Sequence, residues 1–80
     1  MSVDEAAVTV DATGLLCPVP VIELARRVGD VAVGETIALL TDDPAAAADV
    51  PAWCRLRAHT YLGAHSVTTT VTAHLVRREH

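Results

Sequence analysis

The chain has 80 residues, about half of them apolar, and a formal net charge of −4 with no lysine. This length allows one small domain, and an acidic balance without clustered positive charge argues against a phosphate-neutralising surface for nucleic acid. The apolar runs are too short for a membrane span of about 20 residues, and the first residues do not resemble a signal peptide, so we expect a cytoplasmic protein.

The first predicted elements are a short strand and an amphipathic helix. Residues 7–10 are rich in β-branched side chains, which predicts a strand, and Thr13 with Gly14 predicts a turn after it. Residues 18–28 place their apolar side chains on one stripe and their charged side chains opposite, which predicts a helix that packs on a sheet and ends at Gly29.

The most informative motif stands at the start of this helix, where Cys17 precedes Pro18 and Pro20. Proline is tolerated in the first turn of a helix, so the two prolines place Cys17 at or next to the N-cap. The positive end of the helix dipole favours a thiolate, and we therefore expect the pKa of Cys17 to fall modestly from its ordinary value of about 8.5. The alternative is a buried cysteine that serves only as a small apolar side chain.

A strand and a second helical region follow. Residues 36–41 are nearly all apolar or β-branched, which predicts a central strand. Asp43 is then expected to cap a helix that has Pro44 in its first position. Because proline interrupts the helix interior, Pro51 predicts a short helical turn over residues 44–49 and a second stretch over 51–58.

The remaining residues predict two more strands, over 59–64 and 70–77, on either side of a turn at 66–69. The element order is then βαβαββ. This order predicts an α+β protein, a two-layer α/β sandwich in which two helices lie on one face of a four-stranded mixed sheet. The Cys17 helix start is expected at the surface.

With these elements placed, the chain resembles the TusA-like sulfur carrier proteins, also called the SirA-like family. Segment 11–20, with Gly14, Cys17, Pro18 and Pro20, looks like that family's signature of a strand, a Gly-Leu turn and a Cys-Pro-x-Pro helix start. Further segments match at similar spacing after the cysteine, namely 34–36, 42–44 and 49–54. The resemblance runs from about Val8 to Arg77, so we expect one TusA-like domain over residues 1–80 with a flexible N-terminus over 1–6.

The resemblance implies a carrier whose Cys17 accepts a persulfide sulfur and hands it to an acceptor thiol, with Gly14, Pro18, Pro20 and Asp43 in support. The implied partners are a cysteine desulfurase or other persulfide donor and a downstream sulfur-acceptor protein. Family members serve tRNA thiolation, molybdenum cofactor maturation and other sulfur metabolism. Such a shuttle works with partners rather than as a stand-alone enzyme, and no cofactor, membrane or direct nucleic-acid contact is expected.

The chain departs from the tRNA-thiolation members beside the cysteine. Leu16 stands where they often carry a basic residue, and Val19 stands where they often carry Glu. Both changes make the rim around Cys17 apolar, so Leu16 and Val19 are candidates for partner docking, where rim charges steer partner choice. Arg27 is a further docking candidate, with a solvated helix face as its alternative.

Cys54 is expected to be structural, because it stands beside Trp53 on a packing helix. The spacing of the histidines and cysteines supports no metal site. Two other functions stay open at this point. A thiol redox protein would pair Cys17 with Cys54, and a non-catalytic interaction module would keep its function as Cys17→Ser.

Overall fold

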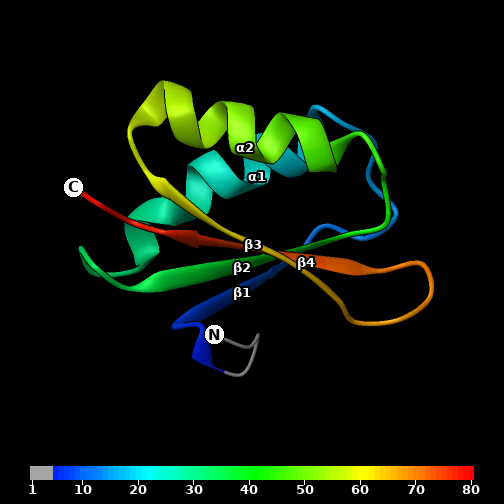
Figure 1. The fold of residues 1–80 in the computed structure, drawn as a ribbon, viewed down its shortest axis with the longest axis horizontal. Coiled ribbons are helices and arrows are strands. Elements are labelled where there is room, and N and C mark those ends of the chain that lie inside the picture. The colour runs from blue at the N-terminus through cyan, green and yellow to red at the C-terminus, as the bar shows by residue number, and fades with distance from the viewer. Residues whose placement is uncertain (1–4) are drawn as a thin grey trace.

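The computed structural model describes residues 5–80 and confirms the predicted α+β fold, with both helices on one face of a four-stranded mixed sheet (Figure 1). The strands are β1 (Val8–Asp11), β2 (Thr36–Thr41), β3 (Thr60–Ser66) and β4 (Thr72–Arg77). The helices are α1 (Val19–Arg27), which continues into the 3-10 turn η2 (Val28–Asp30), and α2 (Ala46–Arg57). Most of the segment expected to be flexible, residues 1–6, lies outside the described residues.

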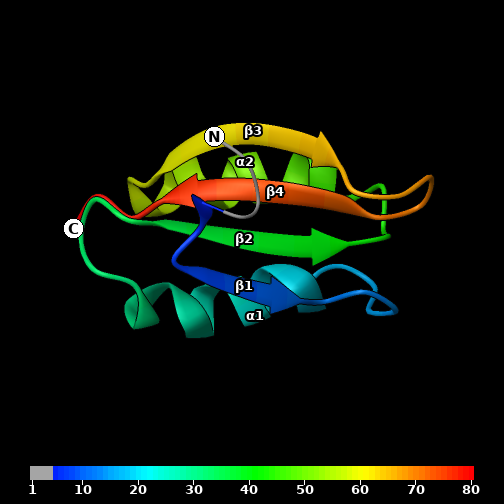
Figure 2. The same ribbon diagram turned by 90° about the horizontal axis from the view of Figure 1, so that it is seen from below.

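The sheet has the strand order β1-β2-β4-β3, which is easiest to follow from below, where the helices lie behind it (Figure 2). Strand β1 pairs parallel to β2, and β4 pairs antiparallel to both β2 and β3. The parallel pair needs a crossover connection, and α1 supplies it. As a consequence, the loops that follow β1 and β2 leave the sheet at the same edge.

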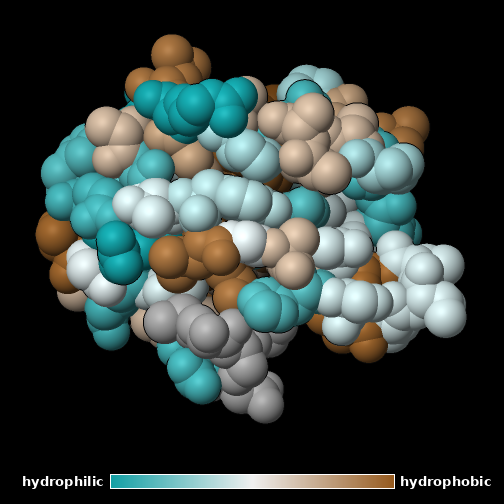
Figure 3. All heavy atoms as spheres, viewed as in Figure 1, coloured by the Kyte–Doolittle hydropathy of each residue, from teal (hydrophilic) through white to brown (hydrophobic). Residues whose placement is uncertain are grey.

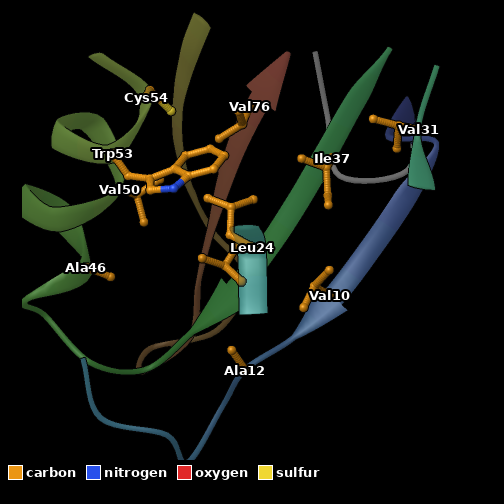
Figure 4. Close-up of a cluster of buried hydrophobic side chains, with 11 residues drawn as sticks. Val10, Ala12, Leu24, Val31, Ile37, Ala46, Val50, Trp53, Cys54 and Val76 are labelled. Carbon is orange, nitrogen blue, oxygen red and sulfur yellow. The ribbon is translucent and has the colours of Figure 1, made fainter. Parts of the chain in front are cut away.

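The core lies between the sheet and the helices and is built from aliphatic side chains around one indole. In Figure 4, Trp53 of α2, Leu24 of α1 and Val76 of β4 point toward one another above the sheet. Leu24 and Val76 are fully buried and Trp53 is 8% exposed. The apolar stripe predicted for the first helix therefore faces the sheet, as its spacing indicated.

Helix α2 differs from the sequence-based expectation, because it is one continuous helix with Pro51 inside it. Proline removes one intrahelical hydrogen bond, here the one that would reach the Ala47 carbonyl. Ala47 is exposed, so water can satisfy that carbonyl. Val50 and Trp53 are buried on either side of Pro51, and this packing holds the helix together across the missing bond.

The last two strands form a hairpin with an irregularity between Tyr61 and Gly63. Gly63 has a φ of 128°, a conformation that other residues rarely adopt. The Tyr61 hydroxyl lies 2.9 Å from Nδ1 of His74, a buried side chain on β4. This contact satisfies one polar atom of an otherwise costly buried histidine.

Candidate functional site

Two loops meet at the edge of the sheet where β1 and β2 both end, the right-hand edge in Figure 1. The Gly14 amide donates a hydrogen bond to Asp42 Oδ1 at 3.0 Å, and the Cys17 amide donates to Asp43 Oδ2 at 2.7 Å. Gly14 has a φ of 80°, so the turn predicted at this position needs glycine. The loop that carries Cys17 is thus held at two points by the loop that precedes α2.

Asp43 organises this junction with both of its carboxylate oxygens. Oδ2 accepts from Cys17, and Oδ1 accepts from the Ala45 amide at 3.0 Å. Asp43 therefore holds the turn that leads into α2, but its expected role as the helix cap is wrong, because the helix begins at Ala46 with Ala45 as its N-cap and no side-chain cap. These two backbone donors stabilise the charged form and lower the pKa of the Asp43 carboxyl.

Cys17 lies directly before Pro18, the N-cap of α1, and Pro20 occupies the first turn of the helix. The Cys17–Pro18 peptide bond is cis. The thiol is partly buried against the core, whereas its neighbours Leu16 and Pro18 are exposed. The cysteine is consequently at the surface and packed on one side only.

The expected fall in the pKa of Cys17 is wrong: burial raises it to about 11. A hydrogen bond from the thiol to Asp49 and the negative charges of Asp43 and Asp49 act in the same direction. The amide that was expected to cap the sulfur is unavailable, because Val19 donates its N–H to the Leu16 carbonyl at 2.9 Å. Two carboxylates and burial therefore outweigh the dipole of the short helix α1.

Comparison with known proteins shows which family the chain belongs to. A family model described as sulfurtransferase TusA matches residues 8–78, nearly the whole chain. The chain belongs to the TusA sulfurtransferase family. Among solved structures, a SirA-like protein from Desulfitobacterium hafniense is similar with a TM-score of 0.78 and 18% sequence identity, over 91% of this chain and 99% of that one. At this identity the likeness shows the fold, and it agrees with the resemblance found in the sequence.

The rim around Cys17 in this TusA-family chain is apolar, as the sequence predicted. Leu16 is 75% exposed and Val19 is 39% exposed, and Ile22 extends the surface along α1. Figure 3 shows apolar residues at separate places along its upper edge, toward the two ends of the helix layer of Figure 1. Exposed apolar side chains that gather beside a reactive group are typical of a docking surface.

An open groove of about 380 Å³ continues this surface between the two helices. Its walls come from Pro18 and Val21 on one side and from Asp49, Trp53 and Leu56 on the other. Leu56 is 79% exposed, so the second wall is also apolar and accessible. The groove begins beside Cys17, which makes it part of the same candidate site.

Two sequence-predicted residues lie away from this site. Arg27 is at the opposite end of α1, where it pairs with Asp30 at 2.6 Å. Cys54 is 1% exposed within the core, and burial raises the pKa of its thiol to about 11. Both cysteines are free thiols. The observed burial of Cys54 fits the structural role expected for it.

Sequence reasoning gave no role to Asp49, which the structure brings to the Cys17 thiol. The available signal was its position in the first turn of α2, where a carboxylate is favourable near the helix dipole. Within residues 5–80, no group of three His, Cys, Asp or Glu side chains could hold a metal ion. No helix in that same part of the chain is long and apolar enough to cross a membrane.

Proposed function

We propose that this protein is a sulfur carrier that holds a sulfane sulfur as a persulfide on Cys17. The proposal is carried by one observation, the placement of Cys17 at an accessible helix start between an apolar rim and two carboxylates. Membership of the TusA sulfurtransferase family supports it. The donor is proposed to be a cysteine desulfurase or another persulfide protein, and the recipient a downstream sulfur-acceptor protein.

Loading is an exchange between a thiol and a persulfide, formally like thiol–disulfide exchange. The Cys17 sulfur attacks the outer sulfur of the donor persulfide, a new S–S bond forms on Cys17, and the S–S bond of the donor breaks. The donor leaves as a thiolate and takes up a proton, while Cys17 loses one. Discharge to the acceptor repeats the same exchange in the other direction. The sulfur moves from donor to acceptor without a net oxidant or reductant.

Because the pKa of Cys17 is raised, the thiol of the unloaded carrier stays protonated and unreactive. With a pKa of about 11, roughly one molecule in ten thousand carries the thiolate at pH 7. Thiolates are the species that oxidise, so the unloaded protein is protected from side reactions. A partner that places positive charge beside Asp43 and Asp49 would lower this pKa and start the exchange only in the complex.

Each neighbouring residue then has a distinct role in the proposal. Asp43 holds the Cys17 backbone, and the carboxylate of Asp49 raises the pKa of the thiol. Leu16 and Val19 give the partner an apolar surface that buries the transferring sulfur away from water. We place the carrier in a reducing compartment such as the cytoplasm, where both thiols stay free and where contact with nucleic acid would pass through a partner.

The test is loading from a donor. The reduced protein is incubated with a cysteine desulfurase and free cysteine, and its intact mass is measured without reductant. It should gain the mass of one sulfur atom and lose it again when an excess of a small thiol is added. Cys54→Ser should load like the parent, and Cys17→Ser should not load. A folded parent protein that gains no sulfur from several persulfide donors would rule out the carrier.

A further inference from the structure

A second cavity lies at the end of the molecule away from Cys17, where both helices terminate. Its volume is about 300 Å³, and its walls include Gly29 of η2, Trp53 and Arg57 of α2, and His59, Arg78 and His80. The full length of α1, about 13 Å at 1.5 Å per residue, separates this cavity from Cys17. The sulfur-transfer site and this cavity are therefore distinct.

The polar groups that line this cavity are cationic or neutral, although the chain as a whole carries a net charge of −4. Two guanidinium groups and two imidazole rings meet there. No carboxylate side chain belongs to the wall, and the nearby Glu79 is held outside it by Thr60 and Arg77. The main-chain oxygen of His80 accepts a hydrogen bond from Arg78 Nε at 2.9 Å, which offsets its negative charge. A concave site lined by one sign of charge concentrates ions of the opposite sign.

The helix-end carbonyls, which would repel an anion, are already covered by donors. His80 Nε2 lies 2.8 Å from the Arg57 carbonyl, and Arg78 donates to the Val31 carbonyl at 2.6 Å. The amides of Ala58 and His59 both donate to the Cys54 carbonyl. These carbonyl oxygens therefore already accept hydrogen bonds, and they repel an approaching anion less than free carbonyls would.

Hydrogen-bond donors in the cavity wall remain available for a ligand. The Arg57 guanidinium makes no hydrogen bond or ion pair within residues 5–80. His59 Nδ1 accepts a hydrogen bond from the Glu79 amide at 3.1 Å, so the ring proton of neutral His59 sits on Nε2. The two histidine rings stack, with centroids 4.7 Å apart, and His59 also stacks on Trp53 at 5.5 Å. This packing holds the His59 ring in place and leaves its Nε2 donor available, whereas His80 Nε2 already contacts the Arg57 carbonyl.

The lowered pKa of His59 is consistent with a positive potential in the cavity. Desolvation lowers the pKa of His59 most, and the charges of His80 and Arg78 lower it further, while Glu79 opposes them by more than Arg57 adds. Cations that suppress one another's protonation in this way stabilise a bound anion.

We propose that this cavity binds a phosphate-type dianion, either free or as a phosphate monoester, between the Arg57 guanidinium, the remaining Nη2 donor of Arg78 and the His59 ring. Arginine suits this ligand because its planar fork of N–H donors matches the oxygens of a phosphate group. The site does not involve Cys17, so binding should be the same in Cys17→Ser and does not depend on the proposed sulfur transfer.

The experiment is a titration of the full chain at pH 7 and constant ionic strength, followed by NMR. Inorganic phosphate should cause saturable shifts of the Gly29 and His59 amides and of the indole of Trp53, the only tryptophan in the chain. A parallel titration with adenosine monophosphate distinguishes the two sources, since the tighter ligand shows whether the cavity takes the free anion or the ester.

The decisive comparison is between two arginines of α2 that contribute the same charge. Arg57→Gln should weaken binding roughly tenfold, as loss of a charge-assisted hydrogen bond does. Arg55→Gln removes an equal charge outside the cavity wall and should bind like the parent. Unsaturated shifts with both ligands would overturn the proposal. So would equal weakening by the two substitutions, because it would show only a general attraction of anions to the helix.

Discussion

At the scale of single residues, the reactivity of Cys17 depends on side chains that are distant in sequence. Its backbone is held by Asp43, in the loop before α2, and the pKa of its thiol is raised by Asp49, in the first turn of α2. One carboxylate positions the cysteine and the other keeps it protonated. The two roles can be separated by substitution, because the first acts on the main chain and the second on the sulfur.

Replacing Asp49 should make the thiol more acidic. In Asp49→Asn the carboxylate charge and its hydrogen bond with the thiol are lost, so the pKa of Cys17 should fall from about 11. Alkylation of Cys17 by iodoacetamide at pH 8 should then be roughly threefold faster or more, with the whole pH profile moved to lower pH. Asp30→Asn, which removes the same charge at the far end of α1, is the matched control. An unchanged profile in Asp49→Asn would refute the assigned contact.

Replacing Asp43 should disturb the position of Cys17 rather than its acidity alone. Asp43→Ala removes the acceptors of the Cys17 and Ala45 amides, so the loop loses its anchor. We expect sulfur loading to slow roughly tenfold or more, since small displacements of a reacting group are costly, and urea unfolding to shift to lower concentration. Asp42→Ala is informative beside it, because it frees Gly14 but leaves the Cys17 amide bonded. Equal loading in Asp43→Ala and the parent would contradict the positioning role.

The motif around Cys17 could be predicted from sequence because it is local. Prolines at the helix start and the Gly14 turn depend on neighbours along the chain. The pKa of Cys17 could not be predicted, since its sign is set by burial and by Asp49, which only the fold brings to the thiol.

At the scale of elements, α2 shows how packing overrides a local signal. Pro51 predicted a break, and the helix continues because buried side chains on both sides of the proline hold it to the sheet. Trp53 is central to this packing. It borders the groove beside Cys17 and also the cationic cavity at the other end, so one side chain supports both surfaces.

Trp53→Ala should therefore be strongly destabilising. The indole is 8% exposed, and removal of a buried tryptophan costs about 3 to 5 kcal/mol, a large share of the stability of a small domain. Leu56→Ala on the same helix is the control, because Leu56 is 79% exposed and its loss should change stability by about 0.5 kcal/mol or less. Urea unfolding followed by circular dichroism measures both. Similar midpoints for the two variants would show that Trp53 does not anchor α2.

At the scale of the whole molecule, the parallel pair β1 and β2 explains why the site exists. Parallel neighbours end at one edge of the sheet, so the loops after them meet there, and hydrogen bonds from Gly14 and Cys17 close the junction. The order of elements could be predicted from the alternation of patterns along the chain. The strand order could not be predicted, because β4 lies between β2 and β3 through contacts between residues that are far apart in the sequence.

The fold as a whole should lose stability on mild acidification. Burial lowers the pKa values of His59 and His74, so both rings are neutral when folded and protonate more readily when unfolded. Their contribution is present above the unfolded value of about 6.5 and is lost as the pH falls through the folded values. Urea midpoints between pH 7.5 and 5 should decline. The decline should be smaller in His74→Gln and unchanged in His65→Gln, an exposed control on β3. A flat parent profile would contradict this expectation.

The proposal that Cys17 carries the sulfur is tested most directly by locating the transferred sulfur. Cleavage after arginine puts Cys17 in a peptide that ends at Arg26 and Cys54 in one that ends at Arg55, so a single mass spectrum separates them. After loading by a cysteine desulfurase and blocking of free thiols, the added sulfur should appear on the Cys17 peptide, with Cys54 recovered as a blocked thiol. Sulfur on Cys54, or a disulfide that joins the two peptides, would contradict a carrier that works through Cys17.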